Sequence, residues 1–168
     1  MQIALTGTPG TGKTTVAALL HYRVLDINSL VRAGMNLGLD PERGCLEADM
    51  DALSGHLASL DGNEPMILEG HFSHHFADWA IVLRLSPAAL RTRLEGRGYS
   101  QSKIRENLEA EALDVILVEA VEMCRQVDEI DTTGRSAAEV AAMIENIIEG
   151  RLHLPPGQAD WLEEFFGR

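Results

Sequence analysis

The feature that most constrains this chain is a glycine-rich stretch that starts at residue 7. Every fixed position of the G-x-x-x-x-G-K-S/T phosphate-binding loop is filled by Gly7-Thr8-Pro9-Gly10-Thr11-Gly12-Lys13-Thr14. The apolar run before it predicts a buried strand at 2–6, and apolar residues at helical spacing after it predict a helix. Glycines let backbone N–H groups surround an anion, and the start of a helix adds positive potential. The stretch therefore predicts a nucleotide-phosphate site.

Individual side chains of this loop suit different parts of a bound nucleotide. Lys13 is a compact cation that can reach the β- and γ-phosphates, and the Thr14 hydroxyl suits a Mg²⁺ ligand. Thr15 lies one residue further along, where its N–H and hydroxyl can reach the α-phosphate. Since only two of the fourteen Lys and Arg residues are lysines, a lysine here indicates a geometric need. The alternative is a glycine-rich turn that binds nothing.

A second group of candidate residues follows the predicted buried strand at 65–68. Ligands of open parallel sheets bind beyond the carboxyl ends of the strands, which is where Glu69 stands. We expect Thr14 and Glu69 to hold Mg²⁺, one directly and the other through water, although Glu69 can also be a capping or salt-bridged acid. Asp26 and Asp49 are the other acids available for this role, and His71 is expected to be a polar active-site group.

The histidines at 71, 74 and 75 resemble a metal cluster in composition. We do not expect a transition-metal site there, because a phosphate site already uses Mg²⁺ and zinc ligands are usually better separated.

Arg97 lies between two glycines at the end of a predicted helix. We interpret this segment as a lid that brings positive charge onto a transferring phosphoryl group. The alternative is a surface turn with a solvated arginine.

The rest of the chain alternates predicted strands and helices. The predicted segments are a strand at 23–25, a mobile glycine-rich loop at 33–45, a helix with its apolar face from Leu46 to Leu60, a strand at 79–85, one long helix at 100–127 and a strand at 128–131. The turn at 132–135 is a candidate resting place for adenine, and the aromatic residues of a short helix at 160–166 are expected to pack on the core. The alternation predicts an α/β fold: a P-loop NTPase three-layer α/β/α sandwich with a five-stranded parallel sheet.

Charge and cysteine content narrow the function classes. A net charge of −12 argues against an extended nucleic-acid-binding surface, although an acidic protein can dock a basic partner. Cys45 and Cys124 offer no disulfide framework and no metal-ligand spacing, which is typical of free thiols in a reducing cytoplasm. No apolar run reaches membrane-spanning length. We expect one soluble, cytoplasmic domain over residues 1–168 with no membrane partner.

Five segments then occur in a characteristic order: Gly7–Thr15, Arg97-Gly98-Tyr99, Lys103–Asn107, Glu109–Ala112 and Glu129–Thr133. In this set the chain resembles, over residues 1 to about 150, the small adenylate-kinase-like NTPases shared by archaea and the eukaryotic nucleus, the adenylate kinase isoenzyme six type. The resemblance implies a nucleoside monophosphate kinase-like fold. It further implies a broad-specificity kinase that transfers the γ-phosphoryl group of ATP to AMP or a related monophosphate. ATPase activity and a role in late maturation of the small ribosomal subunit, with a basic ribosomal protein as partner, are also implied.

The resemblance also assigns regions and residues. It implies a monophosphate-binding region at about 27–50 and a lid at about 96–106, followed by a helical tail at about 151–168. The cofactors are ATP and Mg²⁺, and the implied ATP contacts are Gly10, Gly12, Lys13, Thr14, Thr15 and Arg97. With the residue-level reasoning, the catalytic candidates are Lys13, Arg97 and His71. One departure is that the family commonly has aspartate, any residue, then histidine where this chain has Glu69-Gly70-His71.

Two alternatives to a monophosphate kinase stay open. One is an ATPase switch in ribosome biogenesis with incidental kinase activity. The other is a P-loop kinase of a different small metabolite, because related folds change acceptors by changing the insertion after the second strand.

Overall fold

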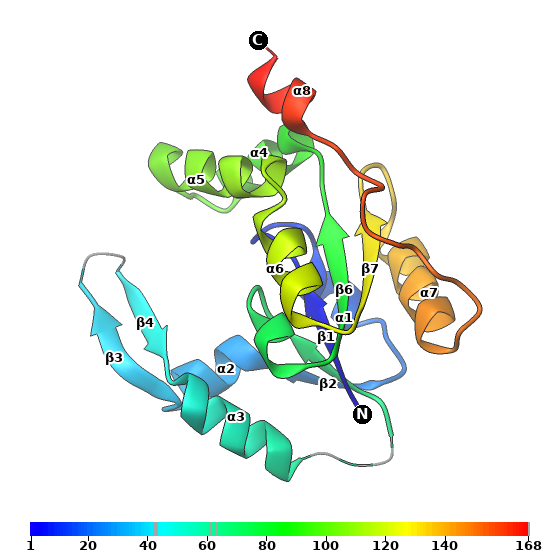
Figure 1. Cartoon of the computed structure of the whole chain (residues 1–168). Helices are drawn as coiled ribbons and strands as arrows, with labels where there is room; N and C mark the ends of the chain where they lie inside the picture. The colour runs from blue at the N-terminus through cyan, green and yellow to red at the C-terminus, as the bar shows by residue number, and fades with distance from the viewer. Residues whose placement is uncertain (42–43, 61, 63, 168) are drawn as a thin grey trace.

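A five-stranded parallel sheet forms the centre of the molecule, with its strands in the order β2-β5-β1-β6-β7 (Figure 1). The computed structural model describes residues 1–41, 44–60, 62 and 64–167. The strands are β1 (Gln2–Thr6), β2 (Arg23–Asp26), β5 (Met66–Glu69), β6 (Trp79–Arg84) and β7 (Gln126–Asp131). Strands buried on both faces have to be largely apolar, as β1, β5 and β6 are. The predicted α/β architecture is confirmed.

Helices cover both faces of this sheet and complete the three layers. On one face, α1 (Lys13–Ala17) and α7 (Ala137–Ile148) pack on the side chains of alternate strand residues such as Ile3 and Ile81. On the other face lie α2 (Ile27–Arg32), α3 (Met50–Ser59) and α6 (Val115–Met123). Beyond the carboxyl end of β6, α4 (Pro87–Gly96) and α5 (Gln101–Ala112) enclose a small apolar core of their own. The remaining helices are η1 (Ser73–Phe76) and α8 (Leu162–Phe166).

The parallel register brings the carboxyl ends of the strands to one edge of the sheet. Asp26 and Glu69, the last residues of β2 and β5, are paired directly in register. Thr6 ends β1 between β5 and β6, and the glycine-rich loop leaves the sheet there. This edge therefore collects the polar residues that the sequence singled out.

The prediction of a loop at 33–45 is wrong in its secondary structure. The structure has an antiparallel hairpin of β3 (Asn36–Asp40) and β4 (Cys45–Ala48), which projects away from the sheet (Figure 1). Glycine and proline dominated the prediction, whereas the alternation of exposed Leu37 and Leu39 with less exposed neighbours is the pattern of a strand. Residues 42 and 43, which belong to the predicted monophosphate-binding region, lie outside the described part of the chain.

Two predicted helices also have different limits. The helix predicted at 100–127 is divided into α5 and α6, because Asp114 adopts the left-handed conformation with φ of 56°. Its carboxylate bonds the buried Arg84 guanidinium at that point, which is a tertiary contact that periodicity does not register. The helix predicted from Leu46 starts only at Met50, after Asp49 as N-cap, and Leu46 belongs to β4.

The C-terminal region follows the prediction in part. Strand β7 begins two residues before the predicted one, and Phe165 of α8 packs against the small core of α4 and α5. Phe166 is exposed rather than packed. None of the described helices has the length and apolarity needed to cross a membrane.

Candidate functional site

The glycine-rich loop is shaped by positions that accept only glycine. Gly7 and Gly10 have φ of 136° and 103°, a region that favours glycine strongly. A Cβ on Gly7 would lie 2.3 Å from the carbonyl oxygen of Leu83, and one on Gly10 would lie 2.6 Å from Leu90 Cδ1. The loop is therefore held tightly against β6 and α4, with a fixed backbone path from β1 into α1.

Lys13 is folded into this loop. Its side chain is buried, and Nζ donates to the carbonyl oxygens of Gly7 at 2.6 Å and Thr8 at 3.0 Å. Burial lowers the pKa of Lys13 to about 8, while the carboxylates of Glu69 and Glu111 act in the opposite direction. The side chain is thus a cation at neutral pH, and a bound phosphate offers its donors a charged alternative to the two carbonyls.

Thr14 and Glu69 lie side by side at the carboxyl end of β5. The Thr14 hydroxyl is 3.4 Å from Glu69 Oε1, and the Glu69 side chain is buried. Burial raises the pKa of Glu69, Lys13 opposes this shift, and Asp26 adds to it. Two oxygen donors beside a phosphate loop are chemically suited to Mg²⁺, which prefers such ligands.

His71 follows this acid and borders the same space. Desolvation lowers its pKa, and the positive charge of Lys13 adds to that effect. The imidazole is consequently neutral at physiological pH, so that it can donate or accept a hydrogen bond without bringing charge.

A cavity of about 870 Å³ joins these residues to more distant elements. Its wall includes Asn28 of α2, Cys45 of β4, and Arg97 and Lys103 of the α4–α5 region. A smaller cavity of about 180 Å³ adjoins the loop and is lined by Thr15, Arg97, Thr132 and Arg135, among others. Arg97 thus borders both cavities, and it is exposed at the C-cap of α4.

The structure brings the predicted site residues together around one cavity. Its wall contains Gly10, Gly12, Lys13, Thr14, Thr15, Glu69, His71 and Arg97. Of the alternative acids, Asp26 stands next to Glu69 in the sheet but binds Ser29 and Arg32. Asp49 caps α3 instead, and it is not among the cavity residues.

The sequence did not predict a role for Arg93 at the phosphate loop. Its Nη1 donates to the carbonyl oxygen of Gly10 at 3.2 Å, so that α4 is fastened to the phosphate loop. The signal available in the sequence is its spacing from Arg97, four residues along one helix, which places both on one face.

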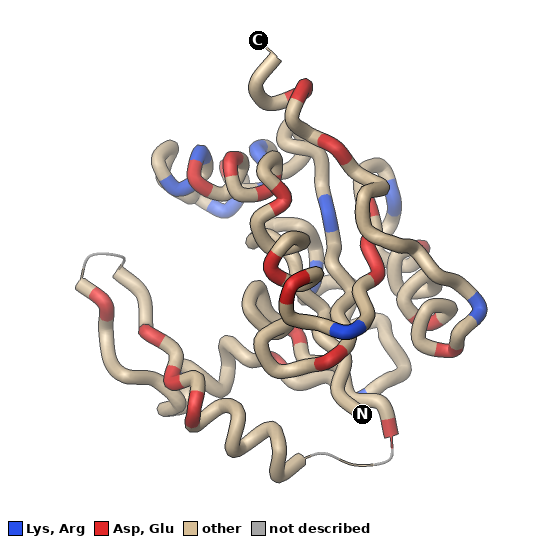
Figure 2. The backbone as a smooth tube through the Cα atoms, viewed as in Figure 1, with Lys and Arg blue, Asp and Glu red and all other residues tan. Residues whose placement is uncertain are grey.

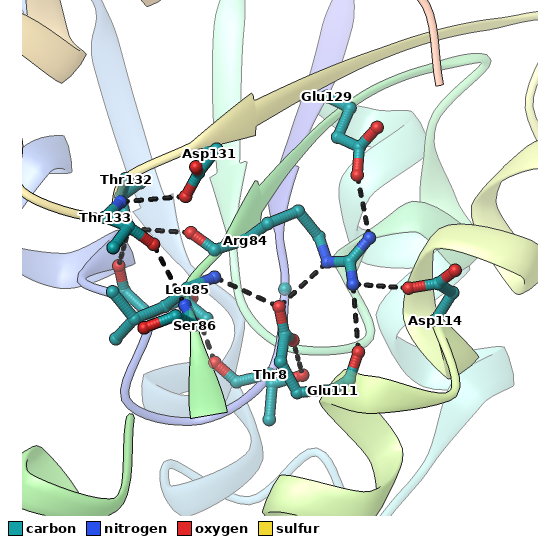
Figure 3. A network of polar contacts seen from close by, with 12 residues as sticks. Thr8, Arg84, Leu85, Ser86, Glu111, Asp114, Glu129, Asp131, Thr132 and Thr133 are labelled. Atoms are coloured by element: carbon teal, nitrogen blue, oxygen red, sulfur yellow. Dashed lines mark hydrogen bonds and ion pairs between the residues drawn. The ribbon is translucent and has the colours of Figure 1, made fainter. Parts of the chain in front are cut away.

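The sequence likewise did not predict a role for Glu111 and Arg84, which form a buried polar network (Figure 3). Glu111 Oε2 accepts from the Thr8 hydroxyl at 2.5 Å, and Oε1 accepts from Arg84 Nε at 2.8 Å and the Leu85 N–H at 3.0 Å. Glu111 shares the apolar helix face of Ile104 and Leu108, where a solvated acid is not expected. An acid on this apolar face is the sequence signal that Glu111 is buried and has a partner.

Two further acids complete the coordination of the Arg84 guanidinium. Nη1 donates to Glu129 at 2.7 Å, and Nη2 bonds Asp114 and the Glu111 carbonyl oxygen. Glu129 in turn accepts from the Gly157 and Gln158 N–H groups at 2.7 and 2.6 Å. The network therefore joins the phosphate loop to β6, α5, β7 and the C-terminal tail.

Comparisons with known proteins agree with this geometry. The family model described as "AAA domain" matches residues 3–114. A "Putative adenylate kinase" of Methanothermobacter thermautotrophicus is 51% identical over 166 residues, which cover 95% of this chain and 96% of that protein. A protein of the same name from Methanosarcina barkeri is 46% identical over 179 residues, covering 97% and 98%.

Among solved structures, the fold is similar to that of a shikimate kinase from Acinetobacter baumannii. The TM-score is 0.55 at 19% identity, and the match covers 89% of this chain and 93% of that one. At this identity the likeness concerns the fold alone. The family match and the near full-length archaeal relatives carry the assignment: the chain belongs to the AAA-domain family of P-loop proteins, together with these archaeal proteins.

Proposed function

We propose that this protein is a broad-specificity nucleoside monophosphate kinase that transfers the γ-phosphoryl group of ATP to AMP or a related monophosphate. The observation that carries the proposal is the cavity of about 870 Å³, which has the phosphate loop as its floor and two different walls. Asn28 and Cys45 come from the insertion after β2, and Arg97 and Lys103 come from the α4–α5 region. A volume near the upper end of the usual range for small-molecule sites suits a donor and an acceptor together.

The donor side is supported by the phosphate loop and by the smaller cavity. Lys13 and the backbone of the loop suit the β- and γ-phosphates, and Thr15 suits the α-phosphate. The cavity of about 180 Å³ between Thr132 and Arg135 is a fitting place for the adenine base. Arg97 borders both cavities, which suits contact with the phosphates of a nucleotide whose base lies in the smaller one.

Thr14 and Glu69 are the residues that would hold Mg²⁺. Their oxygens lie 3.4 Å apart, and a buried carboxylate is unfavourable unless positive charge stands close to it. When bound, the ion neutralises charge on the phosphoryl oxygens. The glutamate, one methylene longer than aspartate, reaches the hydroxyl in this structure.

The lid residues are suited to the transfer itself. Phosphoryl transfer depends on positioning and on stabilisation of charge, so an added cation is the main requirement. Arg97 precedes Gly98, whose φ of 72° marks a turn that few other residues adopt. We infer that this turn lets Arg97 close over the phosphates, while neutral His71 orients the acceptor or a water by hydrogen bonding.

A second candidate function is an ATPase that acts in small ribosomal subunit maturation. Its support is the projecting β3–β4 hairpin, which carries acidic and no basic residues along its described strands (Figure 2). Leu37 and Leu39 of the same hairpin are exposed. Such a surface suits a basic ribosomal protein as partner. We place either activity in the cytoplasm, since Cys45 and Cys124 are free thiols.

An acceptor panel tests the proposal directly. The protein is incubated with Mg²⁺-ATP alone and with AMP, CMP, dCMP or shikimate, and the products are separated. The proposal expects ADP formation to rise several-fold with at least one nucleoside monophosphate and the matching diphosphate to appear. ADP formation that no monophosphate changes would favour the ATPase, and stimulation by shikimate alone would favour a metabolite kinase.

A further inference from the structure

A cluster of three metal-binding side chains lies outside the phosphate cavity. His74 and His75 belong to η1, and Glu119 comes from α6, 45 residues further along the chain than His74. One ligand atom from each lies within 4.8 Å of the others, and His74 Nε2 is 3.3 Å from Glu119 Oε2. The His74 side chain is fully buried, whereas His75 and Glu119 are exposed.

The hydrogen bonds around His74 are satisfied by a tautomer with the proton on Nδ1. The Thr6 hydroxyl has a single hydrogen to donate. Its oxygen lies 3.1 Å from the His71 carbonyl oxygen, which can only accept. The same hydroxyl oxygen lies 3.1 Å from His74 Nδ1. Both contacts are hydrogen bonds when Nδ1–H donates to Thr6 and Thr6 donates to His71.

With the proton on Nδ1, the other ring nitrogen of a neutral His74, Nε2, carries no proton and has a free lone pair. In that tautomer Nε2 and a carboxylate oxygen of Glu119, 3.3 Å apart, are both electron-pair donors that a cation can bridge. A cation between the two atoms satisfies both.

We propose that His74, His75 and Glu119 bind a divalent transition-metal ion, with Zn²⁺ as the best match. Two imidazoles and one carboxylate, with solvent at the fourth position, are a known ligand set for this ion. Bonds of 2.0–2.1 Å in a tetrahedron place ligand atoms about 3.3 Å apart, which agrees with the His74–Glu119 separation of 3.3 Å. His75 is exposed, so its ring has room to turn toward the ion.

The surroundings support this site in two ways. Metal-binding histidines usually donate their second ring N–H to a neighbouring group, which is what Thr6 provides for His74. His74 and His75 also line a separate cavity of about 550 Å³, which gives an ion access from solvent. The close spacing of the histidines argued against a metal in the sequence, but a ligand from distant α6 changes that argument.

The ion would connect η1 to α6 and hold the end of β1. Thr6 is the residue before Gly7, so the chain His74–Thr6 reaches the start of the phosphate loop. A bound ion would thereby link α6 to the segment that carries His71 and to the exit of β1. This inference goes beyond the proposed kinase activity and does not depend on it.

The test is Zn²⁺ titration of the full chain by isothermal calorimetry, without nucleotide and with excess Mg²⁺. The background is Cys45→Ser, which removes the exposed thiol. We expect one Zn²⁺ per chain and a rise in the melting temperature on binding. His75→Ala and Glu119→Gln change exposed positions, so they should fold normally, and each should weaken Zn²⁺ affinity about tenfold or more.

Matched controls come from the same kinds of position. Glu122→Gln changes another exposed acid of α6, and His56→Ala changes a histidine of α3; both should leave affinity and stoichiometry unchanged. The proposal is overturned if the background protein binds no Zn²⁺, or if the Glu119 and His75 variants bind it as tightly as the controls. Circular dichroism of each variant before titration verifies that it is folded.

Discussion

Two parts of the phosphate site are built in opposite ways. We call the phosphate loop and the Arg84 network bonded to it the floor, and the α4–α5 region and the β3–β4 hairpin the rim. In the floor, the Arg84 guanidinium is buried and meets Glu111, Glu129 and Asp114. In the rim, the corresponding cations are exposed: Arg97 ends α4, and Lys103 lies in the first turn of α5. The β3–β4 hairpin, which projects away from the sheet (Figure 1), likewise has exposed leucines, Leu37 and Leu39.

This difference matches two requirements of phosphoryl transfer. Groups that receive phosphate charge act best when they are fixed beforehand, since no reorganisation is then needed during the reaction. Groups that close over two substrates must move, and moving elements have few buried contacts. From this comparison we infer that stability and movement are assigned to different parts of one site. The predictions below test that division, from the largest expected effect to the smallest.

Removal of a buried acid from the floor should have the largest effect. Glu111→Ala leaves Arg84 and Thr8 without a main partner, and breaking a buried ion pair typically costs about 3–5 kcal/mol. Urea unfolding monitored by circular dichroism measures the change. The matched control is Glu109→Ala on the same helix, whose partner Arg105 is exposed, and which should cost about 1 kcal/mol or less. Equal losses in the two variants would contradict the division.

Removal of the buried lysine should abolish most activity with the fold retained. Lys13→Ala deletes the cation that we propose contacts the β- and γ-phosphates, and loss of one such donor costs a hundredfold to a thousandfold, or about 3–4 kcal/mol. The turnover number at saturating ATP is the measurement. Arg23→Ala, an exposed cation at the start of β2, serves as control and should retain activity. Near-normal turnover of a folded Lys13→Ala protein would remove the phosphate-site assignment.

Neutralising the acid at the end of β5 should weaken the use of Mg²⁺. Glu69→Gln keeps the size of the side chain but removes its charge beside Thr14. We expect the Mg²⁺ concentration at half-maximal rate to rise about tenfold. Asp26→Asn tests the neighbouring acid in parallel. A shift in the Asp26 variant, with none in the Glu69 variant, would transfer the role to Asp26.

Changes on the rim should hardly alter stability. Leu37→Ser and Leu39→Ser replace side chains that are 67% and 68% exposed, so unfolding free energies should change by about 0.5 kcal/mol or less. Urea unfolding is again the measurement, and Leu53→Ser, at a fully buried position of α3, is the contrasting control. A large loss in the hairpin variants would mean that this arm is part of the fixed structure.

The sequence predicted the phosphate loop and the acid after β5, but not the buried contacts that join the loop to β6 and α5. The phosphate loop and the acid after β5 are local patterns, since each residue type sits at a fixed offset from a strand end. Arg84 and Glu111 were not predicted because their value depends on contacts between β6 and α5, which are 26–27 residues apart. Asp114 shows the same limit, since a distant guanidinium interrupts what periodicity describes as one helix.

The sequence predicted where the rim segments lie along the chain, but not the secondary structure of the hairpin. Glycines at 34, 38 and 44 indicated a loop, yet a hairpin forms because residues 36–40 and 45–48 can pair as strands. The alternation at Leu37 and Leu39 was the signal for a strand, but a two-stranded ribbon with exposed leucines buries little apolar surface to strengthen that signal. Arg97 lies on the cavity wall. That it belongs to a lid that closes over the nucleotide stays a prediction.

The most direct test of the central claim compares transfer and hydrolysis in Arg97→Ala. The claim is that a fixed floor binds the phosphates and a movable rim directs the phosphoryl group to an acceptor rather than to water. ADP formation is measured with and without AMP, in the wild type, in Arg97→Ala and in Arg91→Ala, an exposed arginine of the same helix. We predict that AMP-dependent transfer falls about a hundredfold in Arg97→Ala, that hydrolysis without AMP falls much less, and that Arg91→Ala retains both. An equal fall of transfer and hydrolysis, or a wild type that AMP does not stimulate, would contradict the account.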